Sequence, residues 1–152
     1  MKKKKYWYIA LILILLIVVA GITMSIIQSK SSFKELVLDH IKDTQEINYI
    51  NIVKNYSEPD EKEIRITDES TIHDIINSFS DLKLKSTRNT QNPDTTYEIR
   101  INADLSNNFT ILLTNKNNIR IHSTIHKNKK YQSWYKLDKE YNFSLIEDLL
   151  NK

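Results

Sequence analysis

The sequence predicts an α+β protein, with an N-terminal transmembrane helix followed by an antiparallel sheet of about four to six strands and helices packed on one face of the sheet. Three observations lead to this fold class. A long amino-terminal stretch is apolar and uncharged, and several later segments alternate apolar and polar side chains. Further segments repeat their apolar residues at helical spacing and can cover one face of a sheet.

The apolar stretch runs from Tyr6 to Ile27 without a charged residue. About 20 helical residues cross a hydrocarbon core of roughly 30 Å, so residues 6–28 are long enough for a transmembrane signal-anchor helix. A secretory signal has a shorter apolar core and ends at a small-x-small cleavage site. The best candidate site, "VVA" before Gly21, has a bulky residue at its first small position. We therefore expect the segment to stay uncleaved.

The charges around this segment predict its orientation. A basic tail over residues 1–5 precedes it, and such lysines are retained on the cytoplasmic side of a membrane. The aromatic residues that follow are typical of the boundary between lipid and water. We expect a lipid bilayer as one partner, and a cell-membrane location with the rest of the chain extracytoplasmic. The predicted membrane anchor residues are Lys2, Lys3, Lys4, Lys5, Tyr6, Trp7 and Tyr8.

Composition excludes several classes of protein. The chain has 22 Lys and Arg against 19 Asp and Glu, and four of those lysines stand in the tail. The remainder is therefore close to neutral, so we expect no nucleic-acid partner. The absence of cysteine excludes a disulfide framework, a zinc ribbon, a thiol nucleophile and a lipid-modified cysteine.

Helical spacing predicts three helices after the anchor. A juxtamembrane joint and helix are expected over residues 29–46, where Ser32 and Glu35 form a capping box ahead of "FKELVLDHIKD". In the extracytoplasmic domain expected over residues 47–152, "DESTIHDIINSFS" has apolar residues at i, i+3, i+4 and i+7, with Asp68 or Ser70 as N-cap. The end, "NFSLIEDLLNK", is also amphipathic.

Alternation of apolar and polar residues predicts strands in the same domain. The extended segments are "EINYINIVKNY", "EIRIT", "DLKLK", "TYEIRIN", "NFTILLT", "NIRIHSTIH" and "KYQSWYKL". The last four are joined by short polar connections, as an antiparallel meander requires. This domain has no glycine, so we expect asparagine at turn positions with positive φ, at Asn107-Asn108 and Asn117-Asn118.

Catalytic and metal chemistry have little support. His122 and His126 stand four residues apart, but on a strand that spacing is about 13 Å, too far for one ion. Asp39, His40 and Asp43 are expected on a solvated helix face. No glycine-containing nucleophile or phosphate-binding motif occurs. We expect no catalytic residue, no metal, no cofactor and no enzymatic activity.

One surface is a candidate for binding. The alternation places Arg100, Arg120 and His122 on the wet face of the sheet. Trp134 lies on the last strand between tyrosines that face the other way, and Trp is frequent at interface hot spots. We take Arg100, Arg120, His122 and Trp134 as the candidate binding surface.

The stretch "EIRITDESTIHDIINSFSDLKLK", followed by an Ile-rich meander ending "YKL…LIEDLL", resembles small membrane-anchored or lipid-linked extracytoplasmic proteins of low-GC Gram-positive bacteria. In that pattern a strand runs into "TD" and then into a helix with I-x-x-I-I-x-x-F spacing, here Ile72, Ile75, Ile76 and Phe79. This chain lacks the lipobox cysteine of the lipid-linked members. The resemblance implies neither an activity nor a functional residue.

The sequence therefore predicts a membrane-anchored extracytoplasmic binding or accessory module, whose partner is another protein of the cell envelope. One alternative is a cell-surface enzyme with a metal or carboxylate site, which His122 or His126 beside a carboxylate in a cleft would favour. Another alternative is an envelope sensor subunit.

Overall fold

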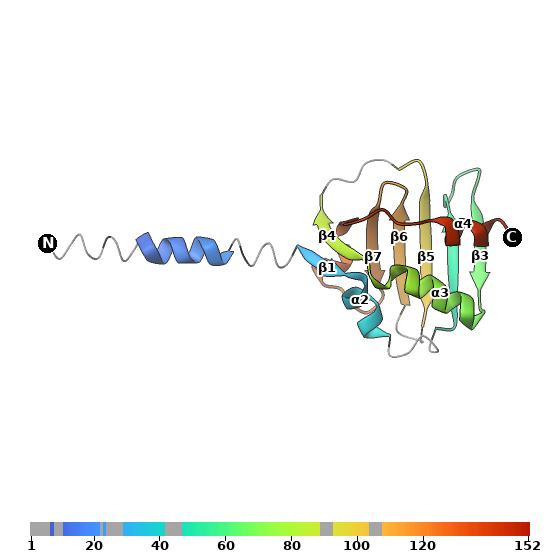
Figure 1. Ribbon diagram of the computed structural model, residues 1–152, viewed down its shortest axis with the longest axis horizontal. Helices are drawn as coiled ribbons and strands as arrows, with labels where there is room; N and C mark the ends of the chain where they lie inside the picture. Colours follow the sequence, from blue (N-terminus) through green and yellow to red (C-terminus); the bar gives the residue numbers. More distant parts are fainter. Residues whose placement is uncertain are drawn as a thin grey trace. The chain divides into compact units, whose positions relative to one another are not determined.

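The computed structural model describes residues 7, 11–21, 23, 29–41, 47–88, 93–103 and 108–152 (Figure 1). The chain divides into two compact units, Met1–Lys30 and Ser31–Lys152. In the first unit residues 11–21 are helical, and the large apolar side chains between Leu11 and Val19 are exposed.

The prediction of a transmembrane helix over residues 6–28 is contradicted by the structure. Within the described ranges, no helix has both the length and the apolar character needed to cross a membrane. The continuous described helix over residues 11–21 rises about 16 Å, roughly half of a hydrocarbon core. Trp7 is helical and exposed, whereas Lys2, Lys3, Lys4, Lys5, Tyr6 and Tyr8 lie outside the described residues.

The second unit is built on one eight-stranded sheet in the order β1-β4-β8-β7-β6-β5-β2-β3. The prediction of about four to six strands is therefore too low. The reason is that every extended segment joins the same sheet, including a short strand ahead of the first helix that has no alternation to reveal it. The strands are β1 (Lys30–Ser32), β2 (Tyr49–Lys54), β3 (Lys62–Ile66), β4 (Lys83–Thr87), β5 (Thr96–Asn102), β6 (Asn108–Thr114), β7 (Asn118–Ser123) and β8 (Trp134–Leu137).

The helices are short. They are α2 (Phe33–Leu36), α3 (Glu69–Ser80) and α4 (Ser144–Leu150), with 3-10 turns η1 (Leu38–His40) and η3 (Lys129–Gln132). Asp68 caps α3, because its carboxylate accepts a hydrogen bond of 2.8 Å from the Thr71 N–H. The helix expected after Ser32 stops at Leu36, since Val37 leaves helical geometry with φ of −126°.

Two connections cross the sheet: the one that contains α3, and the last segment, which leads to α4 (Figure 1). β2 and β3 form an antiparallel hairpin at one edge, and α3 then leads to β4, which pairs with β8 near the other edge. The long connection after β4 returns to β5, and β5 to β8 follow as an antiparallel meander. The last segment crosses back, so that α4 contacts β3.

One face of the sheet and the helices share the core. Strand positions on that side are fully buried, as shown by Ile99 on β5 and Ile111 on β6. The ring of Phe79 on α3 stacks on Phe33 at 5.2 Å and on Tyr141 at 4.8 Å between centroids. Stacked aromatic rings bury large apolar areas, so this contact joins α2, α3 and the final segment to one core.

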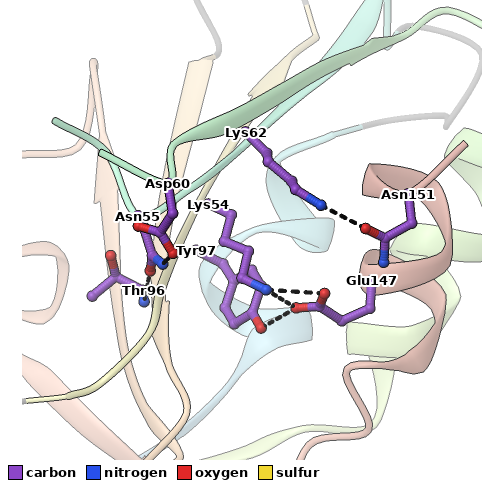
Figure 2. A network of polar contacts seen from close by, with 8 residues as sticks. All are labelled: Lys54, Asn55, Asp60, Lys62, Thr96, Tyr97, Glu147 and Asn151. Atoms are coloured by element: carbon purple, nitrogen blue, oxygen red, sulfur yellow. Dashed lines mark hydrogen bonds and ion pairs between the residues drawn. The ribbon is translucent and has the colours of Figure 1, made fainter. Parts of the chain in front are cut away.

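A polar network fastens α4 to the sheet (Figure 2). Lys54 Nζ on β2 donates hydrogen bonds of 2.9 and 3.0 Å to the Glu147 carboxylate, and the Tyr97 hydroxyl on β5 donates to the same group. Lys62 Nζ on β3 donates to Asn151 Oδ1 at 2.6 Å. Burial raises the pKa of Glu147, but the bonds from Tyr97 and Lys54 outweigh burial and leave the pKa below its usual value.

Asparagine supplies positive φ in two of the described turns. Of the expected positions, Asn117 has positive φ, Asn108 and Asn118 begin strands without it, and Asn107 lies outside the described residues. Asn117 has φ of 57° between β6 and β7, and Asn55 has φ of 52° after β2. Asn55 Nδ2 also donates to Asp60 at 2.7 Å, and its Oδ1 accepts from the Thr96 N–H at 3.0 Å (Figure 2). Ser57, with φ of 64°, was not expected at such a position.

Candidate binding surface on the open sheet face

The face of the sheet that points away from α2, α3 and α4 is called the open face (Figure 1). Its side chains alternate along each strand with those of the core. The central ones are Asn51 and Val53 on β2, Glu98 and Arg100 on β5, Thr110 and Leu112 on β6, Arg120 and His122 on β7, Trp134 and Lys136 on β8, and Lys85 on β4.

Strand register brings the four candidate residues of the sequence together on this face. One row of cross-strand partners runs Glu98, Leu112, Arg120 and Trp134. The adjoining row runs Arg100, Thr110 and His122. Arg100, Arg120, His122 and Trp134 therefore lie in two neighbouring rows across β5 to β8.

A shallow depression occupies the middle of the open face. It has a volume of about 320 Å³ and is lined by Glu98, Thr110, Leu112, Arg120 and His122. Leu112 is the one apolar residue in the lining of this depression. Sequence reasoning missed the role of Leu112, although its place on the wet face of an alternating strand is the signal that could have found it.

On β2, β3 and β5 the charges of the open face are compensated. Arg100 Nε donates to the Glu98 carboxylate at 2.6 Å. This hydrogen bond is the largest cause of the raised pKa of Arg100, which Glu63 also raises by its charge. The Arg65 guanidinium lies 3.7 Å from the centroid of the Tyr49 ring. We call these five side chains, Glu63, Arg65, Glu98, Arg100 and Tyr49, the compensated half.

On the described parts of β4, β7 and β8 the charged side chains of the open face are lysines and an arginine, with no carboxylate among them. We call Lys85, Arg120, His122 and Lys136, together with Trp134, the basic half. Among the described residues none of these side chains makes an ion pair. Lys85 and Lys136 are direct cross-strand partners, a pairing of like charges that destabilises a sheet.

Some polar atoms of this face are buried without a partner. Arg120 Nε and Asn51 Oδ1 have no hydrogen-bond partner among the described residues. An unpaired buried polar atom costs about 1–3 kcal/mol, so such atoms are rare in a surface shaped only for stability.

His122 and His126 lie in different surroundings. His122 is exposed on the open face, whereas the His126 ring lies 4.2 Å from the His40 ring and 5.2 Å from the Tyr131 ring, between centroids. His40 is half-buried rather than solvated, and sequence reasoning missed its contact with His126 because the two lie far apart in the chain. Asp43 lies outside the described residues.

The described carboxylates form no metal-binding group with these histidines. In the described part of the chain, no group of three or more His, Cys, Asp or Glu side chains is placed to hold a metal ion. Glu98 and His122 line the same depression, but they stand two strands apart, roughly 10 Å, and the Glu98 carboxylate bonds to Arg100. The geometry is not that of a carboxylate and histidine acting together.

A second depression, of about 560 Å³, lies at the start of α3 and is lined by Asp68, Glu69, Ser70, His73 and Asp74. Its chemistry is that of a helix terminus. Asp68 bonds to Thr71, which lowers the pKa of the carboxyl, and the His73 ring contacts Asn77 at 3.0 Å. These bonds engage two of the five lining residues, Asp68 and His73, in contacts within the helix itself.

Comparison with family models, with curated proteins and with solved structures finds no match for this chain. A function must therefore be argued from the surface itself.

Proposed function

We propose that this chain is a binding module for another protein of the cell envelope, and that the open face is its contact surface. One observation carries the proposal. The described helices α2, α3 and α4 leave one wide sheet face uncovered, and this face combines an apolar lining residue, a tryptophan and one buried arginine atom, Arg120 Nε, that lacks a described partner.

The size of the open face supports this proposal. Strands lie about 4.8 Å apart, so the seven strands from β3 to β4 span roughly 29 Å, and their length is about 20 Å. The projected area is on the order of 600 Å². A standard protein interface buries about 800 Å² on each partner, so the open face can supply most of one.

The chemistry of the face also supports a protein partner. Arg and Trp are enriched among residues that dominate binding energy, and here they are direct cross-strand partners, Arg120 on β7 and Trp134 on β8. A partner that brings an acceptor to Arg120 Nε would remove the cost of burying that atom.

A lipid bilayer remains part of the proposal. The helical residues 11–21 expose large apolar side chains, Leu15 at 63% and Ile17 at 71%, and exposing such a surface to water is unfavourable. We propose that this unit associates with the cell membrane and that the Ser31–Lys152 unit acts on its outer side. Protease added to intact cells should then digest the Ser31–Lys152 unit, and its survival would contradict this location.

The contact surface is tested by site-specific photocrosslinking in intact cells. A photoreactive residue at Thr110, on the open face, should give one discrete adduct that disappears in an Arg120→Glu background. The same residue at Asp74, exposed on α3, serves as the matched control and should give none. Equal adducts at both positions, or none at Thr110, would overturn the proposal.

A further inference from the structure

We propose that the basic half of the open face binds an acidic segment of the partner protein, one in which carboxylates alternate with apolar residues. This inference rests on the proposed function and adds the chemistry of the partner. It depends on the difference between the compensated half and the basic half of one continuous face.

The first argument is the unbalanced charge. In the compensated half Glu98 neutralises Arg100, and Glu63 lies close enough to act on the same guanidinium. In the basic half Lys85, Arg120 and Lys136 make no ion pair with any described residue. A carboxylate from outside would therefore meet cations that no described carboxylate engages.

The second argument is the like-charge pair. Lys85 and Lys136 stand directly opposite one another on β4 and β8, where an oppositely charged pair would stabilise the sheet. An arrangement that works against stability in the free protein becomes favourable when an anion lies between the two ammonium groups. The pair is therefore suited to bind a carboxylate between the two ammonium groups.

The third argument is the order of side chains in one row. Leu112, Arg120 and Trp134 are consecutive cross-strand partners, so a cation with a buried, unpaired Nε stands between two apolar side chains. The row is complementary to a segment that presents a carboxylate flanked by apolar groups. A purely anionic polymer would leave Leu112 and Trp134 without a partner, which is why we favour a protein segment.

Binding is tested on the full chain in detergent micelles. The probe is a short fluorescein-labelled peptide of alternating Glu and Leu. A Trp7→Phe background leaves Trp134 as the single tryptophan, since the chain has two. Binding of the peptide should raise its fluorescence anisotropy and change the emission of Trp134. The affinity should fall as the salt concentration is raised.

Charge-reversal variants sharpen the test. Lys136→Glu and Arg120→Glu should each weaken peptide binding about tenfold or more. Arg65→Glu makes the same change of charge on the same face but in the compensated half, and it should alter affinity no more than about twofold. Equal losses from Lys136→Glu and Arg65→Glu would mean a response to net charge alone and would overturn the inference.

Lys85→Glu separates binding from stability. It converts the like-charge pair with Lys136 into an opposite pair, so the melting temperature should rise while peptide affinity falls. A merely structural role for Lys85 would not move the two measurements in opposite directions. A rise in both, or a fall in both, would contradict the inference.

Competition identifies the source of the anion. The competitors are unlabelled peptide, vesicles that contain anionic lipid, and single-stranded DNA. If the vesicles or the DNA displace the labelled peptide more effectively than unlabelled peptide does, the assignment to a protein segment is overturned. If the Thr110 adduct forms in cells but survives Lys136→Glu and the peptide does not bind, the acidic segment is wrong and the proposed function stands. If the Thr110 adduct is absent, the proposed function itself fails.

Discussion

The two faces of the sheet are made by the same strands, yet they obey different rules. On the covered face, side chains such as Ile99, Ile111 and Ile121 are fully buried beneath the helices. On the open face, their immediate neighbours are polar, charged or half-exposed, and two lysines stand opposite one another. Packing therefore determines the residues of one face, whereas the other is free to carry features that stability alone would remove.

The largest expected effect lies at the centre of the covered face. Phe79→Ala should lower the free energy of unfolding by about 3–5 kcal/mol, because it removes a fully buried ring that stacks on Phe33 and Tyr141. Urea denaturation followed by circular dichroism measures the change. Phe79→Leu, which keeps most of the volume, should cost less. A loss below about 1.5 kcal/mol for Phe79→Ala would show that the core is not centred on this ring.

Adjacent residues on β6 provide a direct comparison of the two faces. Ile111 points into the core and is 0% exposed, whereas Leu112 lies on the open face. Ile111→Ala should cost about 2–5 kcal/mol, and Leu112→Ala no more than about 1 kcal/mol. Paired urea titrations of the two variants test this. Equal costs would mean that the open face is as well packed as the core.

The network that holds α4 should give a smaller effect that depends on pH. Glu147→Gln should lower the free energy of unfolding by about 1 kcal/mol at neutral pH, because it removes the charge that Lys54 and Tyr97 engage. The folded-state pKa of Glu147 is lowered from 4.5, so this contribution is present above pH 4.5 and is lost as pH falls through the folded value. The gap between wild type and variant should therefore close in acid. A gap that stays constant to low pH would contradict the ionised network.

The smallest expected effect has the opposite sign. Arg120→Met keeps the volume of the side chain but removes the buried Nε that lacks a partner. The free energy of unfolding should stay the same or rise by up to about 1 kcal/mol. Thermal unfolding of the full chain measures it. A clear loss of stability would show that Arg120 supports the fold and would remove it as evidence for binding.

Local chemistry made part of the fold predictable. The i, i+3, i+4, i+7 spacing after Asp68 predicts α3, and all four apolar residues of that pattern are buried. Strict alternation predicts β5, β6 and the start of β7, and so it also predicts that Arg100, Arg120 and His122 share a face. These inferences use only a residue and its neighbours within a turn or a strand.

Long-range features could not be predicted in the same way. The period of a strand does not reveal its neighbour, so nothing indicated that β4 lies beside β8 and that Lys85 meets Lys136. β1 has only three residues and no period at all. The contact of His40 with His126 depends on two loops whose approach is decided by the whole fold. The expected transmembrane helix came from the length and apolar character of residues 6–28, and the described helices do not bear it out.

The order of strands in the sheet also has a consequence during synthesis. β4 is completed at Thr87, but its partner β8 ends only at Leu137, after the entire meander. At about 5–20 residues per second, a ribosome needs roughly 3–10 s to make the intervening chain. During that interval the edge of β4 that will pair with β8 presents unpaired amide and carbonyl groups, and charged side chains such as Lys83 and Lys85 disfavour pairing of that edge with another chain.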